Sequence, residues 1–264
     1  MSDLPPPWDG GTPPDRGSAS RSPLRKALRI AAGVAVVVVL AATAQDLARG
    51  TSGPRIQAGD RDLTPSPTAP SQSRDPSAAL LADLIVTDAD VGPTLNVSGM
   101  QGGNGLTQPT LDLCNATYAS EAMRTARLQV LAVDAQGRAA LSTEAVLYSS
   151  GAGTAAAFSE LKATSAACQD GVTRFGPAPD GAWPQVPTVE RLAFAFETVD
   201  PTSGETDHSV AVYLRRGRAL LGVYFSHADA PTAVVEGKTA LGDIVNIFAN
   251  RLAKLPVAAV STTA

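Results

Sequence analysis

Few side chains in this sequence belong to the types that most often do chemistry: two histidines, His208 and His227, and two cysteines, Cys114 and Cys168. His208 lies near the start of the first strand of an expected hairpin, and His227 lies at the end of its second strand. Pairing of the two strands would bring them together, as a metal or proton-relay site would need. No cluster of Cys, Asp or Glu completes such a site, and exposed strand-end histidines are the simpler interpretation. The sequence also lacks G-x-S-x-G, HExxH, paired CxxC and Walker motifs. It therefore predicts no catalytic residue, no metal ligand and no cofactor.

A polar face of the expected sheet is the better lead. If helices cover the apolar strand positions, the alternate positions form a second face with charged and aromatic side chains. A polar sheet face of this kind is ordinarily a solvent-exposed surface without a binding role. The alternative is that it forms a ligand-binding site. The apolar set is Leu128, Leu147, Leu192, Phe194 and Phe196; the opposite set is Arg127, Glu144, Tyr148, Arg191 and Glu197, joined by Tyr213, Arg215 and Tyr224. The candidate ligand-binding residues are Glu144, Tyr148, Arg191, Tyr213 and Tyr224.

The two cysteines allow two interpretations. In an oxidising compartment Cys114 and Cys168 would form a disulfide, which closes a loop long enough to stabilise the fold by about 4 kcal/mol in the chain-entropy model. Two buried free thiols are the alternative, and would be commoner in a cytoplasmic domain. The export signal described below favours the disulfide.

The elements that must position these residues follow from periodicity. Residues 124–134 alternate and return as 139–149 after Gln136-Gly137, and residues 207–215 and 218–227 form a second hairpin around Arg216-Gly217. Residues 188–199 form a strand, and helices are expected at 77–85, 154–169 and 232–255. The predicted fold class is α+β: an antiparallel β-sheet with helices packed on one face, preceded by one transmembrane helix.

That transmembrane helix is residues 28–46, whose uncharged core is 30–44. Fifteen residues reach about 22 Å, against about 30 Å of hydrocarbon; snorkelling of Lys26 and Arg29 reduces the deficit. Basic residues precede the segment, so the positive-inside rule places the N-terminus in the cytoplasm and the rest of the chain outside. Ala42-Thr43-Ala44 also fits a cleaved signal peptide, and a buried core helix is the third interpretation. The long, Pro-rich N-terminal segment favours an uncleaved signal-anchor.

Composition divides the remaining chain. Residues 1–27 and 47–76 are rich in Pro, Ser and Thr, and are expected to be a disordered cytoplasmic tail and a disordered linker. Residues 77–256 are long enough for one domain with its own core, and 257–264 are expected to be a disordered tail. The formal net charge of −4 excludes a nucleic-acid partner, because no basic stripe is present to neutralise phosphates.

The order of several motifs resembles a known family. LLADLIVTDADVG is followed by LDLCN, by a hairpin ending EAVLYSS, by AAAFSELKATSAAC and by the last long helix. This order is similar to the PknH-like extracellular sensor domain of actinobacterial serine/threonine kinases and related lipoproteins. The resemblance covers residues 77–255 and implies an antiparallel sheet with flanking helices and a cleft for an unidentified ligand. The chain departs from the family in having one cysteine pair instead of two, and no kinase domain.

We therefore expect a single-pass membrane protein with an extracytoplasmic, non-catalytic ligand-binding or sensor-like domain. Its expected partners are the membrane and an unknown small ligand or cell-envelope component. One alternative is a module that docks another envelope protein, and a further alternative is an extracytoplasmic hydrolase with an unrecognised site. A deep cleft on the polar sheet face would favour the binding domain, and a flat apolar patch would favour the docking module.

Overall fold

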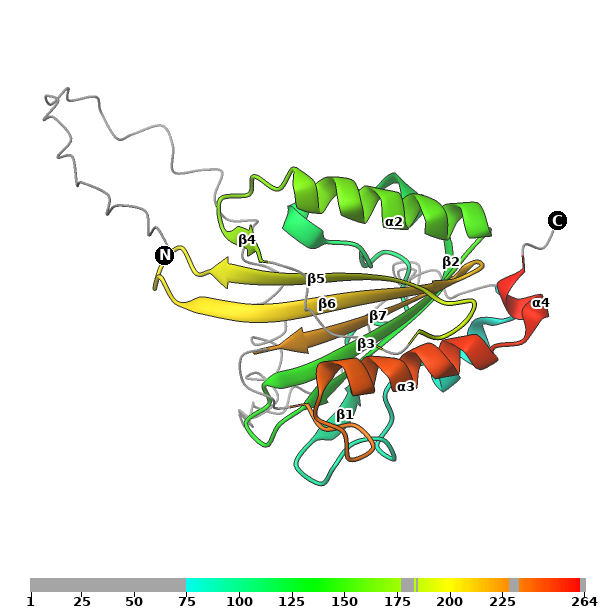
Figure 1. Ribbon diagram of the computed structural model, residues 1–264, viewed down its shortest axis with the longest axis horizontal. Coiled ribbons are helices and arrows are strands. Elements are labelled where there is room, and N and C mark those ends of the chain that lie inside the picture. Colours follow the sequence, from blue (N-terminus) through cyan, green and yellow to red (C-terminus); the bar gives the residue numbers. More distant parts are fainter. Residues whose placement is uncertain (1–74, 177–182, 184, 228–232, 262–264) are drawn as a thin grey trace, which may run out of the picture. The chain divides into compact units, whose positions relative to one another are not determined.

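One antiparallel sheet of seven strands organises the part of the chain that the computed structural model describes, residues 75–176, 183, 185–227 and 233–261. The strand order is β1-β2-β3-β7-β6-β5-β4 (Figure 1). The strands are β1 (Asn96–Gly99), β2 (Arg124–Val133), β3 (Ala139–Tyr148), β4 (Thr173–Phe175), β5 (Glu190–Val199), β6 (Thr206–Arg216) and β7 (Ala219–Ser226). The helices are η1 (Ala78–Asp83), η2 (Leu113–Asn115), η3 (Ala119–Met123), α2 (Gly151–Ala166), α3 (Leu241–Lys254) and α4 (Val257–Val260).

Two hairpins form the centre of the sheet, and both match the predicted ones. In the β2–β3 turn, Asp134 accepts the backbone N–H groups of Gln136 and Arg138, and Gly137 supplies a positive φ of 76°. In the β6–β7 turn, Gly217 has a φ of 55°, and a Cβ there would overlap the Val260 carbonyl oxygen. β3 and β7 then pair with each other and join the two hairpins into one sheet.

The two longest helices lie on opposite faces of the sheet. Phe248 and Leu252 of α3 belong to the same buried cluster as Leu147 of β3, whereas Phe158 of α2 packs in a second cluster with Tyr148. Successive strand residues point to opposite faces, so adjacent residues of β3 contact different helices. Figure 1 shows α2 and α3 on either side of the strands.

The predicted arrangement of helices on one face is therefore wrong. The described residues form few helices, and the two longest, α2 and α3, cover opposite faces of the seven-stranded sheet. The physical reason is that both faces are buried: every residue of β3 is buried, so apolar character no longer marks one side. Leu128 and Leu147 face α3, but Leu192, Phe194 and Phe196 pack in the cluster that contains α2.

The predicted transmembrane helix lies in a part of the chain that the structure does not describe. Within the described part of the chain, no helix has the length and apolar character needed to cross a bilayer. The predicted span, residues 28–46, and the two segments around it up to residue 74 lie outside the described residues.

Both ends of the described chain meet at the turn before β7. The Arg218 side chain donates hydrogen bonds to Asp75, at 3.0 Å for one of them, and to the Ala259 carbonyl at 2.8 Å. The Arg218 backbone N–H donates to the Val260 carbonyl at 2.9 Å. The segment Val257–Val260, predicted to lie in a disordered tail, is thus the short helix α4 held against the sheet.

Candidate functional site

Three of the five candidate residues lie together on the α2 face. Glu144 of β3 pairs in register with Gly222 of β7, which pairs with Tyr213 of β6. The Tyr224 hydroxyl donates to Glu144 Oε2 at 3.3 Å, and the rings of Tyr213 and Tyr224 are 5.7 Å apart, edge to face. Gly222 makes this possible, because a Cβ there would overlap the Tyr224 ring.

Glu144 is the centre of a buried polar network. Its carboxylate also accepts hydrogen bonds from Arg127 Nε and, at 2.9 Å, from Thr110 Oγ1. Arg127 donates onward to Gln129, whose amide donates to Ser142 Oγ at 3.1 Å. We call Thr110, Arg127, Gln129, Ser142, Glu144 and Tyr224 the Glu144 network. Both members of the ion pair are almost wholly buried, with side-chain exposures of 2% for Arg127 and 3% for Glu144.

A loop of residues 102–112 covers this network and is held by charged side chains. Arg124 donates to the carbonyl oxygens of Leu106 (2.8 Å) and Gln108 (2.7 Å), and Arg127 donates to that of Gly102. Glu121 accepts the backbone N–H groups of Thr110 and Leu111 at 2.9 and 3.1 Å. Thr110 and Leu111 of this partly exposed loop are buried, and buried backbone groups need such partners, so the charged side chains fix the loop over Glu144.

Burial changes the acidity of two carboxyl groups, Glu144 beneath this loop and Asp112 at the end of the loop itself. Burial raises the pKa of Glu144 to about 7, although Arg127 beside it acts in the opposite direction. Burial likewise raises the pKa of Asp112 to about 6. These shifts arise because a charged carboxylate loses its hydration inside the protein.

The fourth candidate, Tyr148, shares the face but not the network. Its side chain is fully buried, and its hydroxyl has no hydrogen-bond partner within the described residues. The ring packs closely on Gly153 at the start of α2, where a Cβ would lie 3.0 Å from it. Tyr148 therefore contributes packing and not a hydrogen bond.

The predicted disulfide is present. Cys114 and Cys168 are bonded, with their Cα atoms 5.8 Å apart. The bond joins η2 to the segment that follows α2. It therefore attaches the chain just beyond the covering loop to the α2 side of the sheet.

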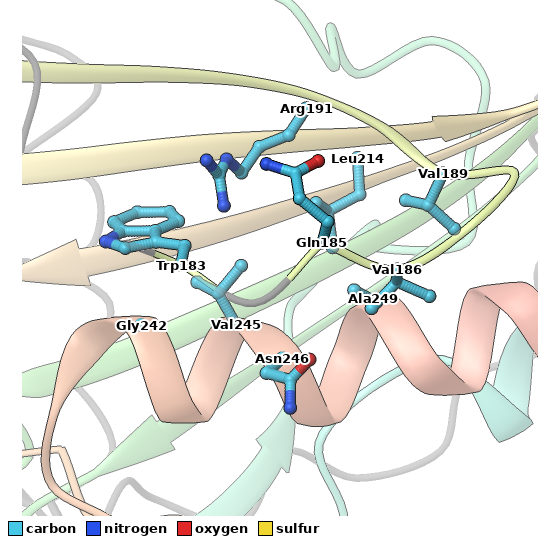
Figure 2. A pocket seen from close by; sticks show the side chains of 10 residues that line it. All are labelled: Trp183, Gln185, Val186, Val189, Arg191, Leu214, Gly242, Val245, Asn246 and Ala249. Atoms are coloured by element: carbon cyan, nitrogen blue, oxygen red, sulfur yellow. The ribbon is translucent and has the colours of Figure 1, made fainter. Parts of the chain in front are cut away.

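The fifth candidate, Arg191, lies on the other face, beside α3. Its guanidinium carbon is 4.5 Å from the centre of the Trp183 ring. These two residues and Gln185 line a pocket with a cavity volume of about 20 Å³ between β5, β6 and α3 (Figure 2). The lining residues are Trp183, Gln185, Val186, Val189, Arg191, Leu214, Gly242, Val245, Asn246 and Ala249; we call this the Arg191 pocket.

Figure 2 shows how the polar groups of the Arg191 pocket lie. The Arg191 guanidinium and the Gln185 amide extend toward each other above α3, with Trp183 beside them. The Asn246 side chain points away from them and accepts a hydrogen bond from Asn250 at 3.2 Å. The pocket therefore offers one cation and one primary amide over apolar walls.

The sequence correctly predicted that Arg191 and Leu192 face opposite ways, but it grouped Arg191 with Glu144 and Tyr148, which lie on the other face of the sheet. It did not identify Trp183 or Gln185 as companions of Arg191. Trp183 lies in a Pro-rich segment between predicted elements, and a residue outside a helix or strand has no periodicity that assigns it to a face. Thr110 was missed for the same reason.

The two histidines do not form a common site. His227 Nδ1 lies 2.8 Å from Asp207, and His208 Nδ1 lies 3.6 Å from Glu197. Each imidazole thus has its own carboxylate at the end of the sheet.

Comparison with known proteins adds no relative. No protein-family model matches this chain, and no curated protein is significantly similar to it.

Proposed function

We propose that the described domain binds a ligand outside the cytoplasm and is not an enzyme. The observation that carries the proposal is the Arg191 pocket, where a guanidinium, an aromatic ring and an amide meet at an opening. Such a combination of apolar walls with a few polar groups is typical of ligand sites. The PknH-like resemblance of the motif order supports a sensor-like role for it.

Two further features support this proposal. A disulfide is expected in oxidising compartments and is rare in the cytosol, and the Cys114–Cys168 bond is such a feature. The charge asymmetry around residues 28–46 favours attachment to a membrane with the domain outside. Raised carboxyl pKa values would otherwise suggest catalysis, but Glu144 and Glu121 are both engaged in structural hydrogen bonds, with Thr110, Arg127 and the backbone of the 102–112 loop.

A thermal-shift screen of the full-length protein against cell-wall fragments and lipids tests the binding part. A ligand present at 100 times its Kd should stabilise the protein by about 2.7 kcal/mol. In Gln185→Trp the indole should occupy the opening, so the shift should disappear while the fold is retained. Gln169→Trp, at an exposed position after α2, is the matched control and should keep the shift. A shift that persists in Gln185→Trp would contradict the assignment of the pocket.

Thiol labelling tests the location. In protein isolated from its native host without reductant, neither Cys114 nor Cys168 should react with maleimide until the disulfide is reduced. Two reactive thiols in the untreated protein would overturn the extracytoplasmic part of the proposal.

A further inference from the structure

Arg191 differs from nearly all other arginines of the described chain in having no polar partner. Seven arginine side chains of the described residues donate hydrogen bonds to a carboxylate or a carbonyl oxygen: Arg124, Arg127, Arg138, Arg215, Arg216, Arg218 and Arg251. Within the same residues, only the side chains of Arg174 and Arg191 make no hydrogen bond or ion pair. Arg174 is exposed on β4, whereas Arg191 lies against a tryptophan at a pocket.

The surroundings of Arg191 favour an anion. Among the described residues that line its pocket, none is acidic and Arg191 is the one charged member. Apolar walls from Val186, Val245 and Leu214 reduce local screening, so a charge of opposite sign is attracted more strongly than at an open surface. Burial against these walls also lowers the pKa of Arg191, although the guanidinium stays protonated.

The geometry also limits what part of a ligand enters. A volume of about 20 Å³ holds little more than one small group, since one water needs at least about 10–15 Å³ on this measure. An oxyanion with two oxygen atoms side by side matches the paired N–H groups of arginine, which bind carboxylates and phosphates through two parallel hydrogen bonds. The Gln185 amide adds a further N–H donor beside them.

We infer that the Arg191 pocket binds the oxyanion end, carboxylate or phosphate, of a ligand whose remaining part lies outside the opening. This inference rests on the proposed binding function and adds the chemical class of the ligand. Trp183 acts as the apolar support that holds the guanidinium in place, and Gln185 as the second donor.

The test uses the tryptophan of the pocket as the probe. Trp8 and Trp183 are the two tryptophans of the chain, so full-length Trp8→Phe protein reports on Trp183 alone. Its fluorescence is titrated at constant ionic strength with benzoate, phenyl phosphate and neutral benzamide. Benzoate or phenyl phosphate should bind with a Kd in the millimolar range, as expected for a single small group, and benzamide at least tenfold more weakly.

Substitutions then assign the effect to the guanidinium. Arg191→Gln should weaken anion binding at least tenfold, and Arg191→Lys should weaken it less, because the charge remains but the planar pair of donors is lost. Arg174→Gln is the control and should leave binding unchanged. The stronger of the two anions identifies the ligand as a carboxylate or a phosphate.

The possible failures are distinguishable. Equal binding of benzamide, or unchanged anion binding by Arg191→Gln, overturns the anion inference; if the screened ligand still loses its shift in Gln185→Trp, the proposed binding function stands. If no probe binds and no screened ligand depends on the pocket, both proposals fail.

Discussion

At the scale of single residues, the Glu144 network places an ion pair in the interior, where desolvation of the charges costs free energy. A buried ion pair is often no more stable than apolar residues of similar volume, whereas removal of one partner is strongly destabilising. Here the carboxylate accepts from Arg127, Thr110 and Tyr224, so its hydrogen-bonding capacity is largely used. Its clearest consequence is a dependence of stability on pH.

Glu144→Gln should reduce that dependence. The pKa of Glu144 rises from 4.5 to about 7 on folding, so the folded state binds the proton more tightly. Its favourable contribution is complete below pH 4.5 and is lost as the pH rises through 7, a change of about 3 kcal/mol. Urea unfolding of the full-length protein at pH 4.5 to 8 should show a smaller decline in Glu144→Gln than in wild type. Exposed Glu205→Gln is the control, and an equal decline in both variants would refute the assignment.

Tyr148→Phe should leave stability unchanged or raise it slightly. The Tyr148 hydroxyl is buried without a hydrogen-bond partner in the described chain, so its removal ends a desolvation cost. The matched variant is Tyr118→Phe, because the Tyr118 hydroxyl donates to the Leu113 carbonyl at 3.0 Å. Tyr118→Phe should lose about 1 kcal/mol. Urea midpoints decide the comparison, and a larger loss in Tyr148→Phe would show that its hydroxyl has an additional partner.

At the scale of elements, the sequence predicted the hairpins better than the faces. Alternation and the glycines of the turns were enough for β2–β3 and β6–β7. β1 and β4 were missed because strands of four and three residues are too short for a period to be visible. Arg191 was predicted to share a face with Glu144 and Tyr148, and it lies on the opposite one. Alternation within a strand shows which of its own residues share a face, but it does not show which residues of another strand lie on that same face.

Helix ends were less predictable than helices. α2 begins at Gly151, before the predicted start at residue 154, and the Thr154 hydroxyl instead donates to the Gly217 carbonyl at 2.6 Å. α3 begins at Leu241, not at residue 232, because Val235 forms bridges with Val91 and Lys238. Long-range contacts of this kind leave no local signal in the sequence.

Loss of the disulfide should destabilise the domain substantially. Cys114 and Cys168 are 54 residues apart, which corresponds to about 4 kcal/mol in the chain-entropy model and to a fall in Tm of about 10 °C. Calorimetry of Cys114→Ser/Cys168→Ser should match wild type measured under reductant. An unchanged Tm would show that packing of η2 against α2 suffices without the covalent bond.

At the scale of the whole molecule, two groups of carboxylates have opposite effects on how the free energy of unfolding changes with pH. Hydrogen bonds from Arg218 lower the pKa of Asp75 to about 2, and Arg251 lowers that of Asp90 against the effect of burial. These contributions are complete above pH 3.8 and are lost as the pH falls. Burial raises the pKa of Asp112 to about 6 and that of Glu144 to about 7, and these contributions are lost as the pH rises.

The free energy of unfolding should therefore be highest near pH 4 to 5. Urea unfolding of the full-length protein from pH 2.5 to 9 measures the profile. Asp112→Asn with Glu144→Gln should move the maximum toward neutral pH, because two groups whose contributions are lost as the pH rises are then removed; Glu121, whose pKa is also raised by burial, is retained. A wild-type maximum at pH 7 or above would contradict the opposed carboxylates.

The hydrogen bonds of the Arg218 guanidinium also limit how far the chain can be truncated at either end without loss of stability. It contacts Asp75 at the first described residue and Ala259 near the last, and it stands beside β7, the middle strand. A clone that starts at codon 77, or one that stops before codon 259, would delete one of these partners. Trimming at either terminus should thus loosen the centre of the sheet as well as its margin, and recombinant fragments need to retain both ends.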